Sequence, residues 1–519
     1  MRELPVTDGY PDDVPCSFGA YPRLLPGHID WIHVLNGEQP PLLDDRFVWL
    51  ELGCGHGVTA VMVAAAHPRA EVYAIDANPA HIRFARQLAT QVGVSNCTFL
   101  EADLRTLAND PETLPVSDYI VSHGLYSWVS PEVREAVHAL LHARLRTGGA
   151  GVVSYNCLPG AATMAAIGHY LRTAASESRG RSSERVRTAV EALRGFRDSG
   201  RGIFASSDGS TRAALASLFP DDSEADFDDL AHEYLTPHWR AFYHDEVVRE
   251  MDGLGLRFVG RATPAHAFAA LTVDESMGRA IEAYADPACR ETALDAMLTP
   301  LMRMDVYVRG SRPLAHQERA EWLRSFRLTT TVAPERLAEP VSLPLGRGRL
   351  DPALAGLGGD ALADATVDLV RFSEVVAEAG YDDAAAVRTL AVWSHSERLV
   401  VSHPRHGVPD GERVERFNQA AAQCVRRGQT LTTLMEPTAG APVRIGAVEI
   451  LVLQALRAGC SPSEATLAHE VMTGLGHSPM IEPPERVRAA VRRTLHEVAP
   501  RARRLGLLGA ESTPAVAEV

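Results

Sequence analysis

The chain has 519 residues, enough for about three structural units at roughly 150 residues each. Hydrophobic residues make up 46% and charged residues 23%, which is ordinary globular usage and excludes a largely disordered chain. Acidic residues outnumber basic ones by 66 to 51, and a net charge of −15 disfavours binding to the phosphate backbone of nucleic acids. We therefore expect a folded protein without a nucleic-acid partner.

Seven cysteines without a C-x-x-C pair are typical of a reducing compartment, and they predict neither a disulfide framework nor a metal site. The N-terminal segment MRELPVTDGYPDDVP lacks the basic and apolar regions of a secretory signal. No apolar run reaches the roughly 18 residues that a membrane-spanning helix needs. We expect a cytoplasmic protein without a membrane partner.

Short β-branched runs alternate with amphipathic stretches over residues 46–160. The predicted strands are FVWLEL, EVYAID, CTFLEAD, DYIVSHG and GVVSY, and Ser130-Pro131 fits the start of a helix between the last two. This rhythm predicts an α/β fold with a doubly wound, parallel, Rossmann-like sheet. Residues 1–45 precede it as a separate N-terminal segment.

Residues 161–245 change to a helical, Ser- and Arg-rich composition, which predicts a helical insertion that caps the sheet. Within it, we interpret the acidic run at 221–229 as a solvated face. Strand patterns return at 255–262 and 301–310, so residues 246–310 are predicted to complete the sheet.

Residues 311–350 contain four prolines, followed by Gly346 and Gly348, and this composition predicts a linker. Beyond it, residues 351–519 show several amphipathic helical patterns and one short strand pattern, RLVVS. We expect a separate, mainly helical C-terminal domain.

The segment Glu51–Gly57, ELGCGHG, lies between the first predicted strand and the helix after it. Glycines let the backbone turn tightly and approach a ligand, and a helix N-terminus presents free N–H groups. A dinucleotide-binding G-x-G-x-x-G pattern would need Gly or Ala where this chain has Val58, so NAD is disfavoured. The motif therefore predicts a site for a small anionic or zwitterionic ligand.

Two acidic residues extend this motif. Asp76 ends the second predicted strand, where a carboxylate can accept both hydroxyls of a ribose, and Asp103 ends the third. With these motifs the chain resembles the class I S-adenosylmethionine-dependent methyltransferases, and the resemblance implies S-adenosylmethionine as the cofactor. It assigns the methionine part to Glu51, Gly53, Cys54, Gly55 and Gly57, the ribose to Asp76 and Ala77, and the adenine to Asp103 and Leu104, with Tyr21 and His123 completing the cofactor site.

A narrower resemblance rests on HGLYSWVSPEVRE, SYNCLPG, HEYL and AFYHDEVVREMDGLGLRFVG. These segments are similar to methyltransferases with a methyltransferase regulatory domain, a group that includes bacterial protein lysine methyltransferases acting on rickettsial outer-membrane protein. The likeness is clear over about residues 20–310 and holds only in outline beyond them. It implies N-methylation of a lysine side chain of a protein or peptide.

Other functions stay open beside this one. A natural-product or small-molecule N- or O-methyltransferase is the first alternative, and a non-catalytic scaffold that binds S-adenosylmethionine is the second. Methylation of nucleic-acid bases is disfavoured, because SHGLYSW stands where such enzymes carry a [DN]-P-P-[YFW] loop. The helical insertion, which we interpret as a cap, has a homodimer interface as its alternative use.

The catalytic residues are predicted from the ends of the fourth and fifth strands, where open α/β sheets bind ligands. Methyl transfer to an amine requires the enzyme to orient a neutral nitrogen and accept its proton. His123 and Tyr126 are predicted to orient or deprotonate the acceptor, and Tyr155 and Asn156 to supply a hydroxyl and a carbonyl. Ordinary packing of the loop is the alternative for the first two.

Three residues are predicted to bind substrate. Trp128 would wall the acceptor site and stack on a cation, and His232 and Tyr243 would reach the substrate from the cap. Glu233, His244 and Asp245 lie in or near the same predicted cap and could also reach it. The alternatives are loop packing for Trp128 and a solvated helix face for the cap residues.

Lysine is absent from the whole sequence, so all 51 basic residues are arginine. A GC-rich genome explains this composition most simply. The alternative hypothesis is that an enzyme acting on lysine avoids its own modification when it contains none, and close relatives with ordinary lysine content would contradict it. The composition does exclude a catalytic lysine.

Overall fold

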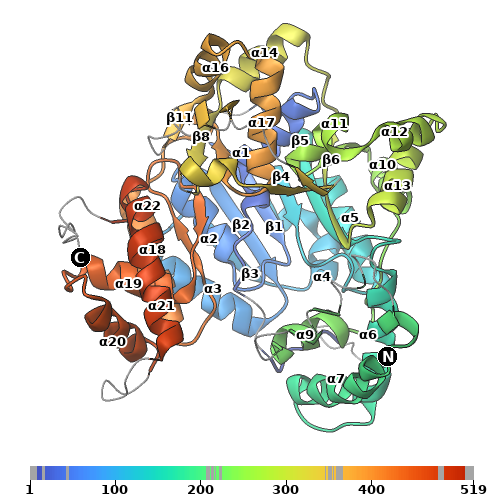
Figure 1. Cartoon of the computed structure of the whole chain (residues 1–519). Coiled ribbons are helices and arrows are strands. Elements are labelled where there is room, and N and C mark those ends of the chain that lie inside the picture. Colours follow the sequence, from blue (N-terminus) through green and yellow to red (C-terminus); the bar gives the residue numbers. More distant parts are fainter. Residues whose placement is uncertain are drawn as a thin grey trace.

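The structure is a computed structural model (Figure 1). It describes residues 9–14, 18–42, 46–205, 211, 215–216, 218–220, 225–332, 334–344, 346–348, 353–354, 356–357, 366–476 and 484–508. Cys16 and residues 221–224 of the acidic run lie outside the described residues. Among the described helices, none has the length and apolar character that crossing a membrane would require.

A seven-stranded sheet forms the centre of the molecule, in the order β3-β2-β1-β4-β5-β7-β6. Its strands are β1 (Val48–Leu52), β2 (Glu71–Asp76), β3 (Cys97–Glu101), β4 (Ser117–Ser122), β5 (Leu145–Asn156), β6 (Leu256–Arg261) and β7 (Met302–Arg309). The first five strands pair in parallel, whereas β7 runs antiparallel to β5 and β6. The predicted doubly wound sheet with two late strands is confirmed, with β7 as its reversed strand.

The strand order turns back between β1 and β4, and such a switch point is where open α/β sheets bind ligands. Successive strand residues point to opposite faces. Trp49 lies in the core on one face and Leu50 in the core on the other, both fully buried. This double burial accounts for the apolar character of β1.

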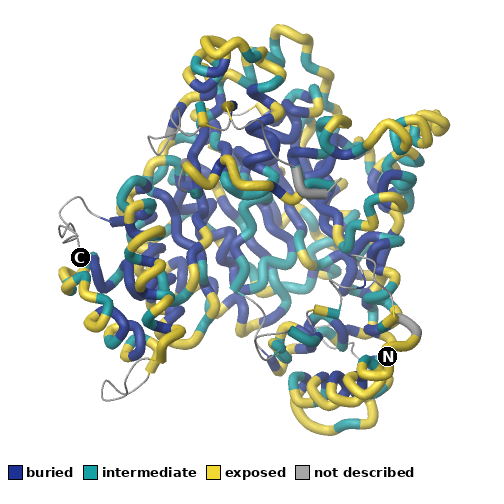
Figure 2. The backbone as a smooth tube through the Cα atoms, viewed as in Figure 1, coloured by how far each residue is buried: buried dark blue, intermediate teal, exposed yellow. Residues whose placement is uncertain are grey.

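Helices cover both faces of the sheet, so that the central strands are dark blue in Figure 2. One face carries α1 (Pro26–Leu35), α2 (Val58–Ala66) and α3 (Pro79–Val92), and the other carries α4 (Leu104–Asn109), α5 (Pro131–Arg144) and α10 (His244–Gly253). Ser130 caps α5 with its side chain and Pro131 is the first helical residue, as predicted.

The predicted helical insertion is present as a group of helices at one end of the sheet (Figure 1). It comprises α6 (Ala162–Ser176), α7 (Ser182–Asp198), the short turn Gly202–Ala205 and α9 (Phe227–Tyr234), which we call the cap. The cap has its own core, in which Leu171, Val190 and Leu230 are buried together. After α10 and β6, α11 (Ala269–Thr272), α12 (Glu275–Glu282) and α13 (Pro287–Leu298) lead back to β7.

The prediction of a linker over residues 311–350 is wrong. This stretch forms α14 (His316–Arg324), β8 (Arg327–Thr330), the turn Pro334–Ala338, β9 (Val341–Leu343) and β10 (Gly346–Gly348). Strand β8 is the centre of a second sheet, and Leu328 on it is fully buried in one core with Trp31 of α1. The prolines and glycines here separate short elements that pack against the first helix.

The C-terminal region is not a separate domain. Its first part adds β11 (Thr366–Asp368), α16 (Leu369–Glu378), α17 (Asp383–His395) and β12 (Leu399–Ser402) to the second sheet and its helices. Its second part comprises α18 (Gly411–Arg426), β13 (Thr433–Met435), β14 (Pro442–Arg444), α19 (Ala447–Arg457), α20 (Glu464–Gly474), α21 (Glu485–Arg493) and α22 (Ala499–Arg504). Helix α18 packs on α2 and α3, so that Phe417 shares a core with Val61.

Candidate active site

The loop between β1 and α2 is built on glycine. Gly53, Gly55 and Gly57 have φ angles of 78°, 52° and 66°, in the left-handed region that favours glycine. A Cβ on Gly57 would lie 2.6 Å from the ring of Phe99 and 2.7 Å from the side chain of Ala85. Glycine is therefore required there for the chain to turn directly from β1 into α2.

The carboxylate of Asp76, at the end of β2, holds this loop in place. Its Oδ2 accepts the backbone N–H of Gly55 at 2.9 Å, and its Oδ1 accepts that of Asn78 at 2.8 Å. The Nδ1 of His81 lies 3.1 Å from Oδ1. The residue predicted to bind ribose thus also ties the glycine loop to the second strand.

Asp103 caps α4 at the end of β3. Its Oδ1 accepts the N–H of Arg105 at 2.8 Å, and the guanidinium of Arg105 binds both carboxylate oxygens. The Asp103 side chain is 21% exposed. Its charge is therefore already paired within the protein.

Glu51 differs from both, because one of its oxygens has no partner. The residue is 4% exposed, and its Oε2 accepts no hydrogen bond from any residue that the structure describes. Burial, and to a lesser extent the charge of Asp76, raises the pKa of the Glu51 carboxyl well above its usual range. A cationic ligand group would satisfy such a buried oxygen.

These residues line a cavity of about 620 Å³, a size typical of small-molecule sites. Its wall includes Tyr21, Glu51, Gly53, Cys54, Gly55, Asp76, Ala77, Asp103, Leu104 and His123. All the residues predicted for the cofactor are brought together here except Gly57. That glycine packs behind the loop, against Phe99.

His123, after β4, is held between two neighbours on this wall. Its Nδ1 lies 2.8 Å from Oγ of Ser154, and its ring meets that of Tyr21 edge-on at 4.2 Å. Burial, assisted by the charge of Arg23, lowers the pKa of His123 to about 4. The imidazole is therefore neutral at neutral pH and is a weak proton acceptor.

The other end of the cavity is formed by the cap and the N-terminal segment. It is lined by Tyr10, Trp128, Met164, Asp229, Leu230, His232, Glu233 and Tyr234. Trp128 and His232, predicted to bind substrate, therefore lie on the cavity wall. In the part of the chain that the structure describes, no residue beyond Met302 lines this cavity.

Two carboxylates also lie at this end. Asp229 was missed as a site residue, whereas for Glu233 the sequence left contact with the substrate and a solvated helix face open. Burial raises the pKa of Glu233 to about 7, although Trp239 donates its Nε1–H to Oε1 of Glu233 at 3.2 Å. Burial and the neighbouring charges of Asp226 and Asp228 raise the pKa of Asp229 to about 6. Asp229 is exposed, in agreement with the predicted solvated face, and it also lines the cavity. The four-residue spacing of Asp229 and Glu233, which puts both on one helix face, is the signal that would have found them.

Tyr126 does not line the cavity. It is fully buried in the core with α5 and α10, where its hydroxyl donates to Glu250 and lies 2.8 Å from Nε2 of His138. The prediction that Tyr126 orients the acceptor is corrected, because the loop turns this side chain into the core.

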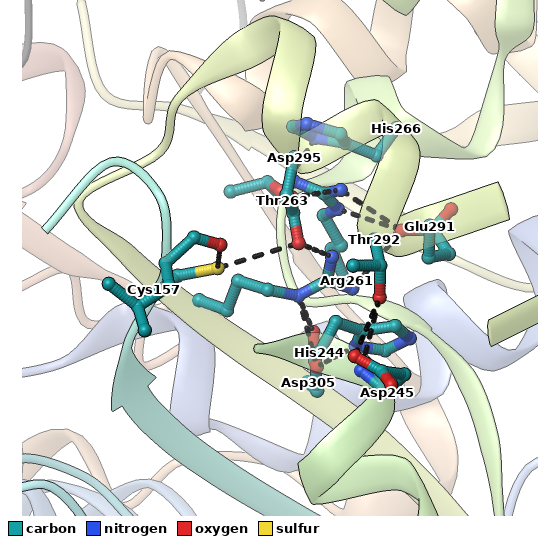
Figure 3. A network of polar contacts seen from close by, with 12 residues as sticks. Cys157, His244, Asp245, Arg261, Thr263, His266, Glu291, Thr292, Asp295 and Asp305 are labelled. Atoms are coloured by element: carbon teal, nitrogen blue, oxygen red, sulfur yellow. Dashed lines mark hydrogen bonds and ion pairs between the residues drawn. The ribbon is translucent and has the colours of Figure 1, made fainter. Parts of the chain in front are cut away.

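Tyr155 is also fully buried behind the cavity wall. Its hydroxyl donates to Oδ2 of Asp305 at 2.7 Å. Asp305 belongs to a buried network with His244 and Arg303, part of which is drawn in Figure 3. This contact makes Tyr155 part of the sheet's internal structure, which corrects its predicted catalytic role.

Asn156 and Tyr243 are likewise absent from the cavity wall. Asn156 is 4% exposed, and its amide lies near Glu233 and helps to lower the pKa of that carboxyl. Tyr243 precedes α10 and is 42% exposed, with its backbone N–H donated to Glu246 at 2.9 Å. Asn156 is therefore a neighbour of the site, and Tyr243 is a helix-start residue outside it.

Two family models match the chain at this site. Residues 50–149 match a family described as "Methyltransferase domain", and residues 226–309 match one described as "Predicted methyltransferase regulatory domain". The first match covers the glycine loop, Asp76 and Asp103. The chain carries a class I methyltransferase domain. The cofactor of this domain is S-adenosylmethionine.

Relatives of the chain are found among curated proteins. An uncharacterized protein of Synechocystis sp. is 30% identical over 343 residues, which are 66% of this chain and 66% of that protein. An uncharacterized protein of Rickettsia prowazekii is 30% identical over 149 residues, 29% of this chain and 58% of that protein. In both cases the match spans less than two thirds of the relative's length.

A solved structure, PKMT2 from Rickettsia typhi in complex with AdoHcy, is similar in fold. Its TM-score is 0.66 at 18% sequence identity, and the match covers 95% of this chain and 99% of that one. The similarity therefore extends beyond the methyltransferase domain to nearly the whole fold.

The residues on the cavity wall fit the cofactor of the methyltransferase domain. The unpartnered Oε2 of Glu51 suits the amino group of its methionine part, and Gly55 leaves space beside the loop, because a Cβ there would meet nothing within 4 Å. A Cβ on Gly53 would lie 3.1 Å from the side chain of Leu125.

Proposed function

We propose that the chain is an S-adenosylmethionine-dependent N-methyltransferase whose acceptor is a side-chain amine, that of lysine, in a protein or peptide. One observation carries the proposal: a single cavity joins the glycine loop of the methyltransferase domain to Asp229 and Glu233 of the cap. The cofactor end and an acidic, aromatic end thus lie within one space.

At the cofactor end, the chain's residues have separate tasks. Glu51 would hold the amino group of the methionine part, Asp76 the ribose hydroxyls, and Leu104 the adenine. When bound, the cofactor supplies a methyl group on a positively charged sulfur. His123, neutral at neutral pH, adds no positive charge to the cavity wall.

At the acceptor end, the chemistry suits an alkylammonium group. The rings of Trp128 and Tyr234 line the cavity beside the two carboxylates. Aromatic faces and carboxylates both attract cations, and more strongly where water is excluded. A neutral alcohol could donate a hydrogen bond to a carboxylate but would lack the attraction between opposite charges, so this end favours an amine.

A protein acceptor is supported by the shape of the cavity and by the chain's relatives. Met302 lines the cavity and is 42% exposed, so the cavity reaches the surface at this residue. A long side chain can enter there while its backbone stays outside. The sequence resemblance to protein lysine methyltransferases and the fold shared with PKMT2 favour the same acceptor.

The test uses S-adenosylmethionine with a deuterated methyl group and a lysate split into protein and small-molecule fractions. Mass spectrometry then locates the label. We expect label on lysine side chains of proteins. Label only in the small-molecule fraction would favour a natural-product methyltransferase instead, and cofactor binding without any transfer would favour a scaffold.

A further inference from the structure

Methyl transfer to lysine requires that the amine first lose a proton. The inference below rests on the proposed function, in which the acceptor is such an amine. A lysine amine has an ordinary pKa near 10.4, so it enters the cavity as an ammonium ion. An ammonium nitrogen has no lone pair with which to form a bond. A group on the cavity wall must therefore take one proton before the new bond forms.

Most acidic groups on the cavity wall already have another partner or another task. Asp76 accepts the N–H groups of Gly55 and Asn78, and Asp103 is paired with Arg105. Glu51 lies near the end of β1, beside the loop that would hold the methionine part of the cofactor. Of the carboxylates on the wall, Asp229 and Glu233 of α9 remain.

The histidines on the wall are weaker candidates. The pKa of His123 is lowered to about 4, so it holds a proton poorly at neutral pH. The Nε2 of His232 lies 3.2 Å from the carbonyl oxygen of Val14, which ties this ring to the N-terminal segment. His56 and His81 lie at the cofactor end, against Phe18 and Asp76.

Glu233 is better placed than Asp229 to become neutral. Helix α9 runs from Phe227 to Tyr234, so Asp229 lies in its first turn and Glu233 in its last. The helix dipole stabilises a negative charge at the first turn and disfavours one at the last. Glu233 therefore gains more than Asp229 when it takes up a proton.

The surroundings of Glu233 hold it in position without neutralising it. Trp239 fixes one carboxylate oxygen from one side, and the amide of Asn156 lies close by on β5. Among the described residues, no arginine forms an ion pair with Glu233. The charge of Asp229, on its own helix, acts on Glu233 and raises its pKa, and the titratable neighbours His232 and Tyr234 lie on the same cavity wall.

We propose that Glu233 binds the acceptor ammonium in the cavity and takes its proton, and that this carboxylate selects amines as acceptors. The proton passes from nitrogen to Glu233, which leaves a neutral amine and a carboxylic acid. The nitrogen lone pair then forms the new N–C bond, while the C–S bond breaks and its electron pair stays on sulfur. The methylated product leaves as an ammonium ion, and Glu233 releases its proton to solvent.

The acidity of Glu233 agrees with this role. Its burial raises the pKa to about 7, against the opposing effect of the Trp239 hydrogen bond. A group with this pKa can both hold a proton during the reaction and lose it afterwards at neutral pH. The same burial lowers the pKa of an ammonium ion, which brings donor and acceptor closer together.

The first experiment measures binding and needs no turnover. Isothermal titration calorimetry at pH 8, with S-adenosylhomocysteine present, compares n-butylammonium binding to the parent protein, Glu233→Gln and Glu191→Gln. Glu191 is an exposed acid of α7 and provides the matched control. We expect Glu233→Gln to bind the probe about ten-fold or more weakly, and Glu191→Gln to bind it as the parent does. Equal binding by Glu233→Gln would overturn the proposal.

The second experiment measures the pH dependence of kcat on the lysine-containing acceptor that the labelling identifies. The parent should reach its plateau just above pH 7, whereas Glu233→Gln should lose about 100-fold at pH 7 and recover as the amine deprotonates at higher pH. Unchanged S-adenosylhomocysteine affinity and melting temperature would show that the variant folds and keeps its cofactor end.

These outcomes separate the two proposals. Label on lysine with the same pH profile in the parent and Glu233→Gln would contradict the role of Glu233 alone. No label on any amine, together with butylammonium binding that depends on Glu233, would contradict the proposed function and keep the ammonium site.

Discussion

Glu51 and Asp76 are both carboxylates at the cofactor end, but only Glu51 has an oxygen without a partner. We predict that Glu51→Gln weakens S-adenosylhomocysteine binding by about ten-fold or more, because a hydrogen bond to a charged group contributes about 1.5–3 kcal/mol. Titration calorimetry measures the change. The melting temperature without ligand should not fall, since the substitution removes a buried charge; unchanged affinity would contradict the assignment.

Asp76→Ala should act in a second way. Its carboxylate accepts the N–H groups of Gly55 and Asn78, so its loss leaves both donors without a partner. We therefore expect both weaker cofactor binding and a lower free energy of unfolding, by about 1–3 kcal/mol. Urea unfolding with and without S-adenosylhomocysteine separates the two effects. A variant that binds the cofactor as tightly as the parent would contradict the site.

Residues that directly follow strands could be predicted, and residues within loops could not. Asp76 is the last residue of β2 and Asp103 follows the end of β3 by two positions, so strand order alone brings them to one edge of the sheet. Tyr126 is the fifth residue of SHGLYSW, in the loop after β4. The sequence of this loop does not determine in which direction the side chain points, and in the structure Tyr126 is buried in the core. The burial of Glu233, which the sequence left open between the substrate and a solvated helix face, could not be predicted for another reason, because it depends on the cap folding over the sheet.

At the scale of elements, buried ion pairs hold helix α13 to the last two strands (Figure 3). Both Asp295 on α13 and Arg303 on β7 are fully buried and lie 2.7 Å apart, and Arg261 on β6 contacts the other oxygen of Asp295 at 2.7 Å. Asp295→Asn removes the charge that both guanidinium groups share. Removing one partner of a buried ion pair lowers the free energy of unfolding by about 3–5 kcal/mol, and we expect this loss for Asp295→Asn.

The measurement for Asp295→Asn is urea unfolding followed by circular dichroism. Glu282→Gln on the neighbouring helix α12 is the matched control, because Glu282 is exposed, and we expect its effect to stay within about 0.5 kcal/mol. Equal stability of Asp295→Asn and the parent would show that α13 is held by other contacts.

The elements of the catalytic sheet could be predicted from periodicity, whereas those of residues 311–350 could not. The strand Arg327–Thr330 has four residues, too few to show an alternating pattern. Its burial comes from Trp31 of α1, nearly 300 positions earlier in the chain. The prolines and glycines of this stretch indicated a linker. Local composition contains no information about such a distant contact, so it could not correct that prediction.

At the scale of the whole molecule, burial holds a set of histidines neutral. It lowers the pKa of His28, His123, His395 and His403 to about 4 and that of His67 and His266 to about 3. In the unfolded chain these groups have pKa values near 6.5. Between these values the unfolded state binds more protons, so the free energy of unfolding falls as the pH falls.

We therefore predict that the melting temperature drops steeply from pH 6.5 towards pH 5. At pH 5.5, each histidine lowers the free energy of unfolding by on the order of 1 kcal/mol. Glu51, Asp229 and Glu233, whose pKa values are raised, act in the opposite direction, because the folded state takes up their protons first. We expect these three acids to offset only part of the effect of the six histidines. Calorimetry between pH 7.5 and 5, with refolding at pH 7.5 as the control, tests this balance, and a melting temperature constant over that range would contradict it.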